Sequence, residues 1–102
     1  MKTKLDIQAA NELRLYIIND YDLYSMTEKI NENLSRKHAL GIYDHGKACK
    51  AFAFAVKLAA MKYCCELCVA TVRYYDIFNA ATRREVCEMM AIDYESEVRA
   101  QC

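Results

Sequence analysis

Apolar side chains recur every three or four residues over most of this chain, which is the spacing of an α-helix with one buried face. The first such stretch follows Asp6, a residue type typical of a helix N-cap, and it ends near Asn19. The cluster 19–22 then offers turn and cap chemistry, and a second stretch runs from about Leu23 to Leu34. This pattern predicts two amphipathic helices in the first third of the chain.

The residues around Gly41 combine the signals for a helix end, a turn and a helix start. Lys37 and His38 suit the negative end of the second helix, and Gly41 stands where a left-handed residue commonly ends a helix. Asp44 can cap a third helix by accepting hydrogen bonds from its free amide groups. We therefore predict a helical hairpin that turns at Gly41.

The third helix is predicted to be the most apolar element and the centre of the core. The residues that fall on one of its sides, at about 100° per residue, are Ala48, Phe52, Ala55, Val56, Ala59 and Tyr63. Its many alanines would let neighbouring helices approach closely.

The last helix begins at Asn79 or at Thr82, where Thr82 and Glu85 fit a capping box. Its pattern turns four apolar residues inward (Val86, Met90, Tyr94 and Val98) and three carboxylates toward water (Glu85, Glu88 and Glu95). The segment before this helix has strand-like propensity without a partner strand, and we interpret it as a connection with a short helical piece.

Length and composition favour one helical domain over residues 1–102. The chain has 102 residues, no proline and only two glycines, so the strongest helix breakers occur at one place alone. We predict an all-α fold, a compact bundle of about four helices with a central apolar helix.

Charge is balanced overall but unevenly distributed. The net charge is zero, which argues against a general nucleic-acid or membrane binder. Residues 36–73 nevertheless carry seven basic and two acidic residues, a net charge of +5 between two acidic ends. The longest apolar stretch, 51–61, is too short and too charged to span a bilayer, so we expect no membrane association.

No motif in the chain predicts an enzyme, a metal site or a cofactor site. The six cysteines include one C-x-x-C, Cys65 to Cys68, whereas zinc sites usually need two such pairs. The first residues lack the apolar region of a secretory signal, so free thiols in a reducing cytoplasm are expected. Capping and dipole roles account for His38, Asp44 and His45, and no nucleophile or phosphate-binding loop accompanies them.

The side of the third helix opposite the core mixes cations with large apolar groups, a combination suited to binding an acidic protein surface. In the alternative interpretation, another helix of the bundle covers this stripe, which is then part of the core. Self-association through Phe54 and Met61 is a further alternative that the sequence leaves open. The predicted partner-binding residues are Arg36, Lys37, Tyr43, Lys47, Lys50, Phe54 and Lys57.

A nucleic-acid-binding regulator is the second hypothesis. The predicted hairpin, with two helices joined by a turn that contains glycine, also fits a helix-turn-helix. In that case His45, Lys47 and Lys50 would enter a DNA major groove. The third helix is long and apolar for a free recognition helix, and the zero net charge is unusual for a phosphate-binding domain.

The order of several sequence blocks resembles a group of short phage-encoded proteins of uncharacterised function. The blocks include NELRLY at 11–16, LSRK at 34–37, GIYDH at 41–45, AAMKY at 59–63 and DYESE at 93–97. The chain departs from that group between residues 64 and 78. The resemblance implies a phage or prophage origin and a host-cytoplasm location, and it supplies no catalytic residues. By analogy, such proteins often bind a host protein or defence complex, anti-CRISPR inhibitors included.

Overall fold

The computed structural model describes residues 4–66 and 78–101, with the side chains of 7–65 and 78–99. Within these ranges the chain forms four α-helices and no strand, which confirms the all-α bundle. The helices are α1 (Lys4–Asn19), α2 (Tyr21–Ala39), α3 (His45–Glu66) and α5 (Ala80–Gln101). The predicted connection over 69–77 lies outside the described residues.

The predicted hairpin between α2 and α3 is present, and local hydrogen bonds explain both helix ends. Gly41 has φ +74°, the left-handed conformation. Its amide donates to the His38 carbonyl and the Ile42 amide donates to the Lys37 carbonyl, each at 3.0 Å, which is the Schellman pattern of a helix end. The Asp44 carboxylate accepts from the Lys47 amide at 2.9 Å and so caps α3.

The starts of the other helices are only partly as predicted. Helix α1 begins at Lys4, so Asp6 lies in its first turn and the predicted cap is wrong; a carboxylate is favourable at either place because both lie at the positive end of the helix. Helix α2 begins at Tyr21 with Asp20 as its cap, two residues before the expected Leu23.

Helix α5 is capped by Asn79, the first of the two predicted starts. The Asn79 side chain accepts a hydrogen bond from the Thr82 amide at 2.8 Å. The capping box at Thr82 is therefore wrong, since Thr82 is the third residue of the helix and is buried. A residue with a capping side chain can also stand inside a first turn, so the local pattern alone could not separate the two starts.

Helix α3 is the centre of the core, as predicted. Its inward residues are fully buried, and Tyr63 at its end is half-buried and makes edge contacts with the rings of Tyr16 and Phe78. The core residues that meet this face include Leu13 and Ile17 of α1, Leu23 and Leu34 of α2, and Val86, Met90 and Tyr94 of α5. Ile7 at the start of α1 is exposed and lies outside this core.

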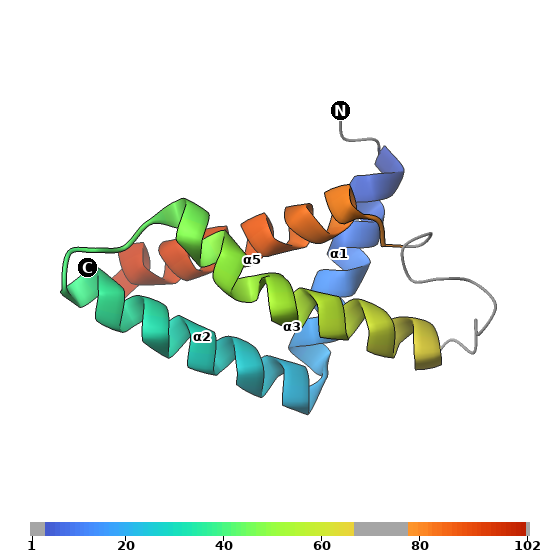
Figure 1. Ribbon diagram of the computed structural model, residues 1–102, viewed down its shortest axis with the longest axis horizontal. Coiled ribbons are helices and arrows are strands. Elements are labelled where there is room, and N and C mark those ends of the chain that lie inside the picture. The colour runs from blue at the N-terminus through green and yellow to red at the C-terminus, as the bar shows by residue number, and fades with distance from the viewer. Residues whose placement is uncertain (1–3, 67–77, 102) are drawn as a thin grey trace.

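The helices are arranged around α3 so that α2 and α5 do not close on each other. Figure 1 shows α3 in front, α2 and α5 running beside it, and α1 crossing behind it. Helix α5 packs closely on α3 and α1, and α2 packs on α3 and α1, while α2 and α5 have little direct contact. None of the described helices is apolar over a sufficient length to cross a membrane.

Candidate protein-docking surface

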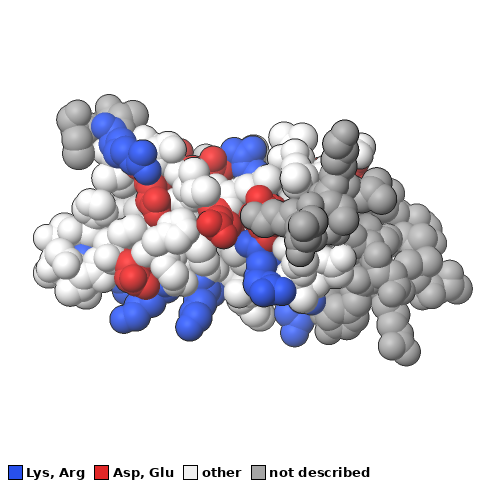
Figure 2. Space-filling view, turned by 90° about the horizontal axis from the view of Figure 1, so that it is seen from above, with Lys and Arg blue, Asp and Glu red and all other residues white. Residues whose placement is uncertain are grey.

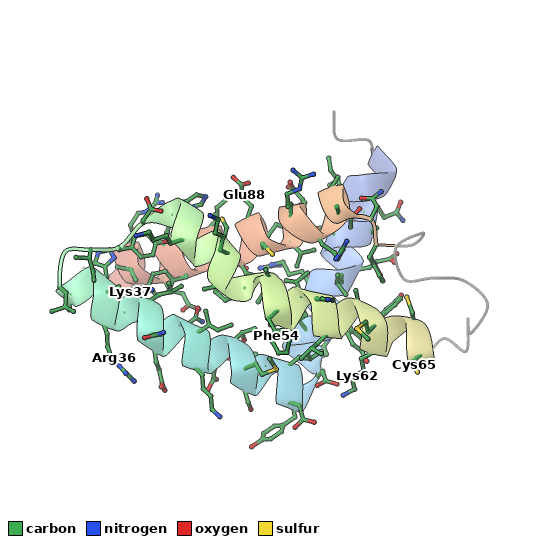
Figure 3. The ribbon with its side chains drawn as sticks, in the orientation of Figure 1. Arg36, Lys37, Phe54, Lys62, Cys65 and Glu88 are labelled. Atoms are coloured by element: carbon green, nitrogen blue, oxygen red, sulfur yellow. The ribbon has the colours of Figure 1, made fainter. Side chains whose placement is uncertain are left out.

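The outer face of α3 is exposed and combines lysines with large apolar side chains. We call it the cationic ridge, and it consists of Lys47, Lys50, Phe54, Lys57 and Met61. Phe54 is 65% exposed and Met61 is 47% exposed, and Figure 3 shows where Phe54 lies along α3. Leu58, next to Lys57, is half-buried against the core and does not belong to the ridge. The described helices therefore do not cover the ridge.

The ridge lysines keep their charge available to a partner. Among the described residues, Lys47, Lys50 and Lys57 have no side-chain hydrogen bond or ion pair. Lys62, one turn beyond Lys57, instead lies 2.5 Å from the Asp20 carboxylate, and their hydrogen bond lowers the pKa of Asp20. The ammonium groups of the ridge thus carry positive charge that no described carboxylate neutralises.

The two predicted cations of α2 lie apart from the ridge. Arg36 is exposed and, in Figure 3, points away from α3 at the far side of α2. Lys37 is half-buried near the end of α2. The structure thus brings together the predicted residues Lys47, Lys50, Phe54 and Lys57, whereas Arg36 faces another direction.

Tyr43 holds the hairpin turn against α5. Its hydroxyl donates to Glu95 Oε1 at 2.8 Å, and its ring lies 5.6 Å from the Tyr94 ring and 5.4 Å from the His38 ring. Burial and the Glu95 carboxylate raise the pKa of Tyr43 well above its ordinary value. Half-buried and already hydrogen-bonded, Tyr43 positions the turn and does not form part of the exposed ridge.

His45, the first residue of α3, forms an ion-pair cluster that the sequence analysis did not find. Its Nδ1 lies 2.5 Å from Glu95 Oε1, and its Nε2 lies 3.7 Å from Glu88 Oε1. The hydrogen bond to Glu95 raises the pKa of His45 and lowers the pKa of Glu95. Glu95, predicted to face water, is therefore half-buried under the turn. Figure 3 shows Glu88 on the outer side of α5.

The same cluster includes the thiol of Cys49, whose pKa is raised. Cys49 Sγ lies 3.6 Å from His45 Nε2, so Cys49, His45 and Glu95 follow one another as in a cysteine hydrolase. Burial and the nearby carboxylates of Glu88 and Glu95 raise the pKa of Cys49, which disfavours the reactive thiolate. Among the described residues, no three His, Cys, Asp or Glu side chains are placed to hold a metal ion.

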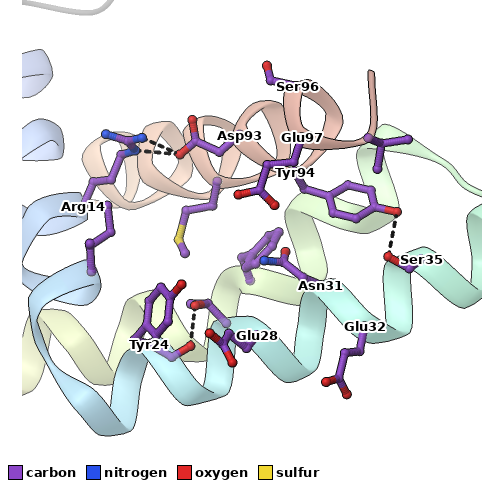
Figure 4. A pocket seen from close by; sticks show the side chains of 15 residues that line it. Arg14, Tyr24, Glu28, Asn31, Glu32, Ser35, Asp93, Tyr94, Ser96 and Glu97 are labelled. Carbon is purple, nitrogen blue, oxygen red and sulfur yellow. Dashed lines mark hydrogen bonds and ion pairs between the residues drawn. The ribbon is translucent and has the colours of Figure 1, made fainter. Parts of the chain in front are cut away.

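A second surface feature, the acidic groove, lies between α2 and α5. It has a volume of about 670 Å³, with Phe52 and Met90 among its apolar lining and carboxylates on both helices. The acidic lining residues are Glu28, Glu32, Asp93 and Glu97. Figure 4 shows the walls and α3 behind them. Figure 2 looks onto another face, from above the view of Figure 1, where acidic side chains lie over the middle and cations lie mainly along the lower edge. The lining comes from four helices, so no single sequence segment signals the groove.

No protein-family model matches this chain, and no curated protein or solved structure is significantly similar to it. The resemblance to short phage proteins therefore stays a prediction based on sequence blocks. What the protein does must be inferred from its own surfaces.

Proposed function

We propose that this protein is a small binding factor that docks its cationic ridge on an acidic surface of a partner protein. The observation that carries the proposal is the exposure of Phe54 between Lys50 and Lys57, whose ammonium groups have no partner among the described residues. An exposed aromatic ring ringed by charges is typical of a binding hot spot, because the ring supplies buried apolar area and the charges steer the encounter.

The class of partner follows from the sequence resemblance. If the chain is a phage or prophage protein in the host cytoplasm, its partner is a host protein or a defence complex, which it binds stoichiometrically and inhibits or redirects. An anti-CRISPR inhibitor is one form of this function. The protein acts by occupying a surface and needs neither catalysis nor a cofactor.

Capture from infected-host lysate, with and without nuclease, tests this proposal. The wild-type protein should retain a protein partner after nuclease treatment, and Phe54→Ala or Lys50→Glu should weaken binding to that partner at least tenfold, about 1.4 kcal/mol. Leu15→Ala and Lys29→Glu are matched controls, because both residues are exposed on other helices. Recovery of nucleic acid alone, with nuclease removing every protein, would contradict the proposal.

A nucleic-acid-binding regulator is the alternative, favoured by Lys47 and Lys50 following the turn at Gly41–Asp44. Two carboxylates, Glu88 and Glu95, lie beside His45 at the start of α3, where a recognition helix would meet phosphates, and they oppose such contact. A mobility-shift titration decides between the two: DNA or RNA affinity should fall steeply with salt and with Lys47→Glu if the alternative holds. Absence of any shift at low salt excludes it.

A further inference from the structure

The acidic groove has more hydrogen-bond acceptors than its own residues use. Its one lining cation, Arg14, binds Asp93, with Nη2 2.6 Å from Oδ2. Glu28 accepts from the Tyr24 hydroxyl, which raises the pKa of Tyr24. Glu32 and Glu97 are exposed and have no ion pair among the described residues. The groove therefore presents uncompensated negative charge.

A buried acceptor in the groove adds to this excess. Asn31 Oδ1 is buried without a hydrogen-bond partner in the described part of the chain, and Asn31 lines the groove between its walls. In Figure 4, Asn31 and Glu28 on α2 and Glu97 on α5 lie around the same space. Carboxylates on both walls, together with the lining residues Ile18, which is exposed, and Val98, which is half-buried, suit an occupant with cations beside an apolar group.

The shape of the groove suits a helix. Helices α2 and α5 both pack on α3 and have little contact with each other, so they form two walls on one base. Helix α1 also packs on these three helices and lines the groove with Arg14 and Ile18, so a stretch of helix laid between the walls would lie beside α1 and share the exposed apolar surface of the groove. The occupant that fits best is therefore an exposed helix face with lysines beside an aromatic ring.

This chain carries such a face itself. We propose that the acidic groove binds the cationic ridge of a second copy of this protein. In the ridge, Lys50 precedes Phe54 by four residues and Lys57 follows it by three, so the two ammonium groups lie about one turn to either side of the ring. Phe54 of one copy enters the groove of the other, and the lysines meet Glu32 and Glu97 on the walls.

The contact is heterologous and does not close into a symmetric dimer. Phe52 lines the groove and Phe54 lies on the ridge, two positions along α3 and hence about 200° around the helix. Ridge and groove therefore face nearly opposite directions, and each copy can bind one neighbour on each side. Such contacts produce open chains whose length grows with concentration.

Complementary charge reversals test the proposal. The ridge variant carries Lys50→Glu and Lys57→Glu, and the groove variant carries Glu32→Lys and Glu97→Lys; all four residues are exposed, so both variants should fold. A contact that buries less than about 1,200 Å² is usually weak, so self-association should be measured at protein concentrations up to about 1 mM. Sedimentation velocity is the assay. Wild type should form open chains at low salt, and each variant alone should be monomeric.

An equimolar mixture of the two variants should regain open chains, because the intact ridge of the groove variant meets the intact groove of the ridge variant, and the two reversed surfaces are complementary to each other in turn. Since the variants have opposite net charges, the control adds Phe54→Ala to both variants, which leaves their charges unchanged and should abolish the chains. Survival of the chains in that control, a monomeric wild type, or a closed wild-type dimer that neither variant disrupts would overturn the proposal. Each of these outcomes leaves the binding of a separate acidic partner to the ridge intact and testable.

Discussion

The ion pair between His45 and Glu95 should make the stability of the protein depend on pH in a specific way. The pKa of His45 is raised above its ordinary value of 6.5, so its contribution is complete below about pH 6.5 and is lost as pH rises through the raised pKa. The pKa of Glu95 is lowered from 4.5, so its contribution is complete above about pH 4.5 and is lost as pH falls. The pair therefore stabilises the fold most between these two values.

The magnitude follows from the exposure of the two side chains. The His45 side chain is 44% exposed and the Glu95 side chain is 21% exposed, so solvent screens part of the attraction. Exposed ion pairs contribute about 0.2–1 kcal/mol to stability. Because Glu95 is mostly buried and also accepts a hydrogen bond from the Tyr43 hydroxyl, this pair should lie near the upper end of that range. We expect about 1 kcal/mol, or about 4–8 °C in Tm for a domain of this size.

Urea unfolding of wild type and His45→Gln at several pH values measures this contribution. The difference in unfolding free energy should be about 1 kcal/mol near pH 6 and should shrink steadily toward pH 9. His38→Gln is the matched control, since the His38 ring packs on Tyr43 and has no carboxylate partner among the described residues. A His45→Gln difference that stays constant from pH 6 to pH 9 would refute the ion-pair reasoning.

Four substitutions test the fold in the same unfolding assay. Phe54→Ala should change the unfolding free energy by less than about 0.5 kcal/mol because the ring is exposed, whereas Phe52→Ala should cost about 3–5 kcal/mol because its ring is fully buried; equal costs would contradict the assigned faces of α3. Gly41→Ala should cost about 1 kcal/mol through backbone strain alone, since an added Cβ meets no atom within 4 Å. Asn79→Ala should cost about 1 kcal/mol through the lost cap, and no loss would mean that α5 starts elsewhere.

The sequence predicted those parts of the fold that depend on nearby residues. Gly41 and Asp44 mark the hairpin because a left-handed glycine and a capping carboxylate act within a few residues of the groups that they satisfy. The start of α5 was ambiguous because Asn79 and Thr82 both carry capping side chains within one turn. Local chemistry thus fixed the turn but left more than one start for α5.

The candidate site was predicted less completely, because its decisive contacts join distant residues. The helical period alone places Lys50, Phe54 and Lys57 on one face, and that face is exposed. The partners of Tyr43 and His45 could not be predicted, since Glu95 lies 50 or more residues further along the chain. The groove depends on how α2 and α5 separate over α3, which no pattern within either helix specifies.

The two surfaces together explain how a partner would affect self-association. A copy whose ridge is occupied by a partner protein keeps a free groove, so it can still accept the ridge of one neighbour, but its own ridge cannot enter another groove. Each bound partner therefore ends one chain of copies. A partner concentration below that of this protein should shorten the chains, and an excess of partner should convert every copy to a one-to-one complex with the partner. The net charge of zero does not indicate this attraction, because the positive charge of the ridge and the negative charge of the groove cancel in the sum. The two charged surfaces nevertheless lie on nearly opposite sides of α3. Their attraction between copies should weaken as salt shortens the Debye length from about 10 Å at 0.1 M to about 3 Å at 1 M.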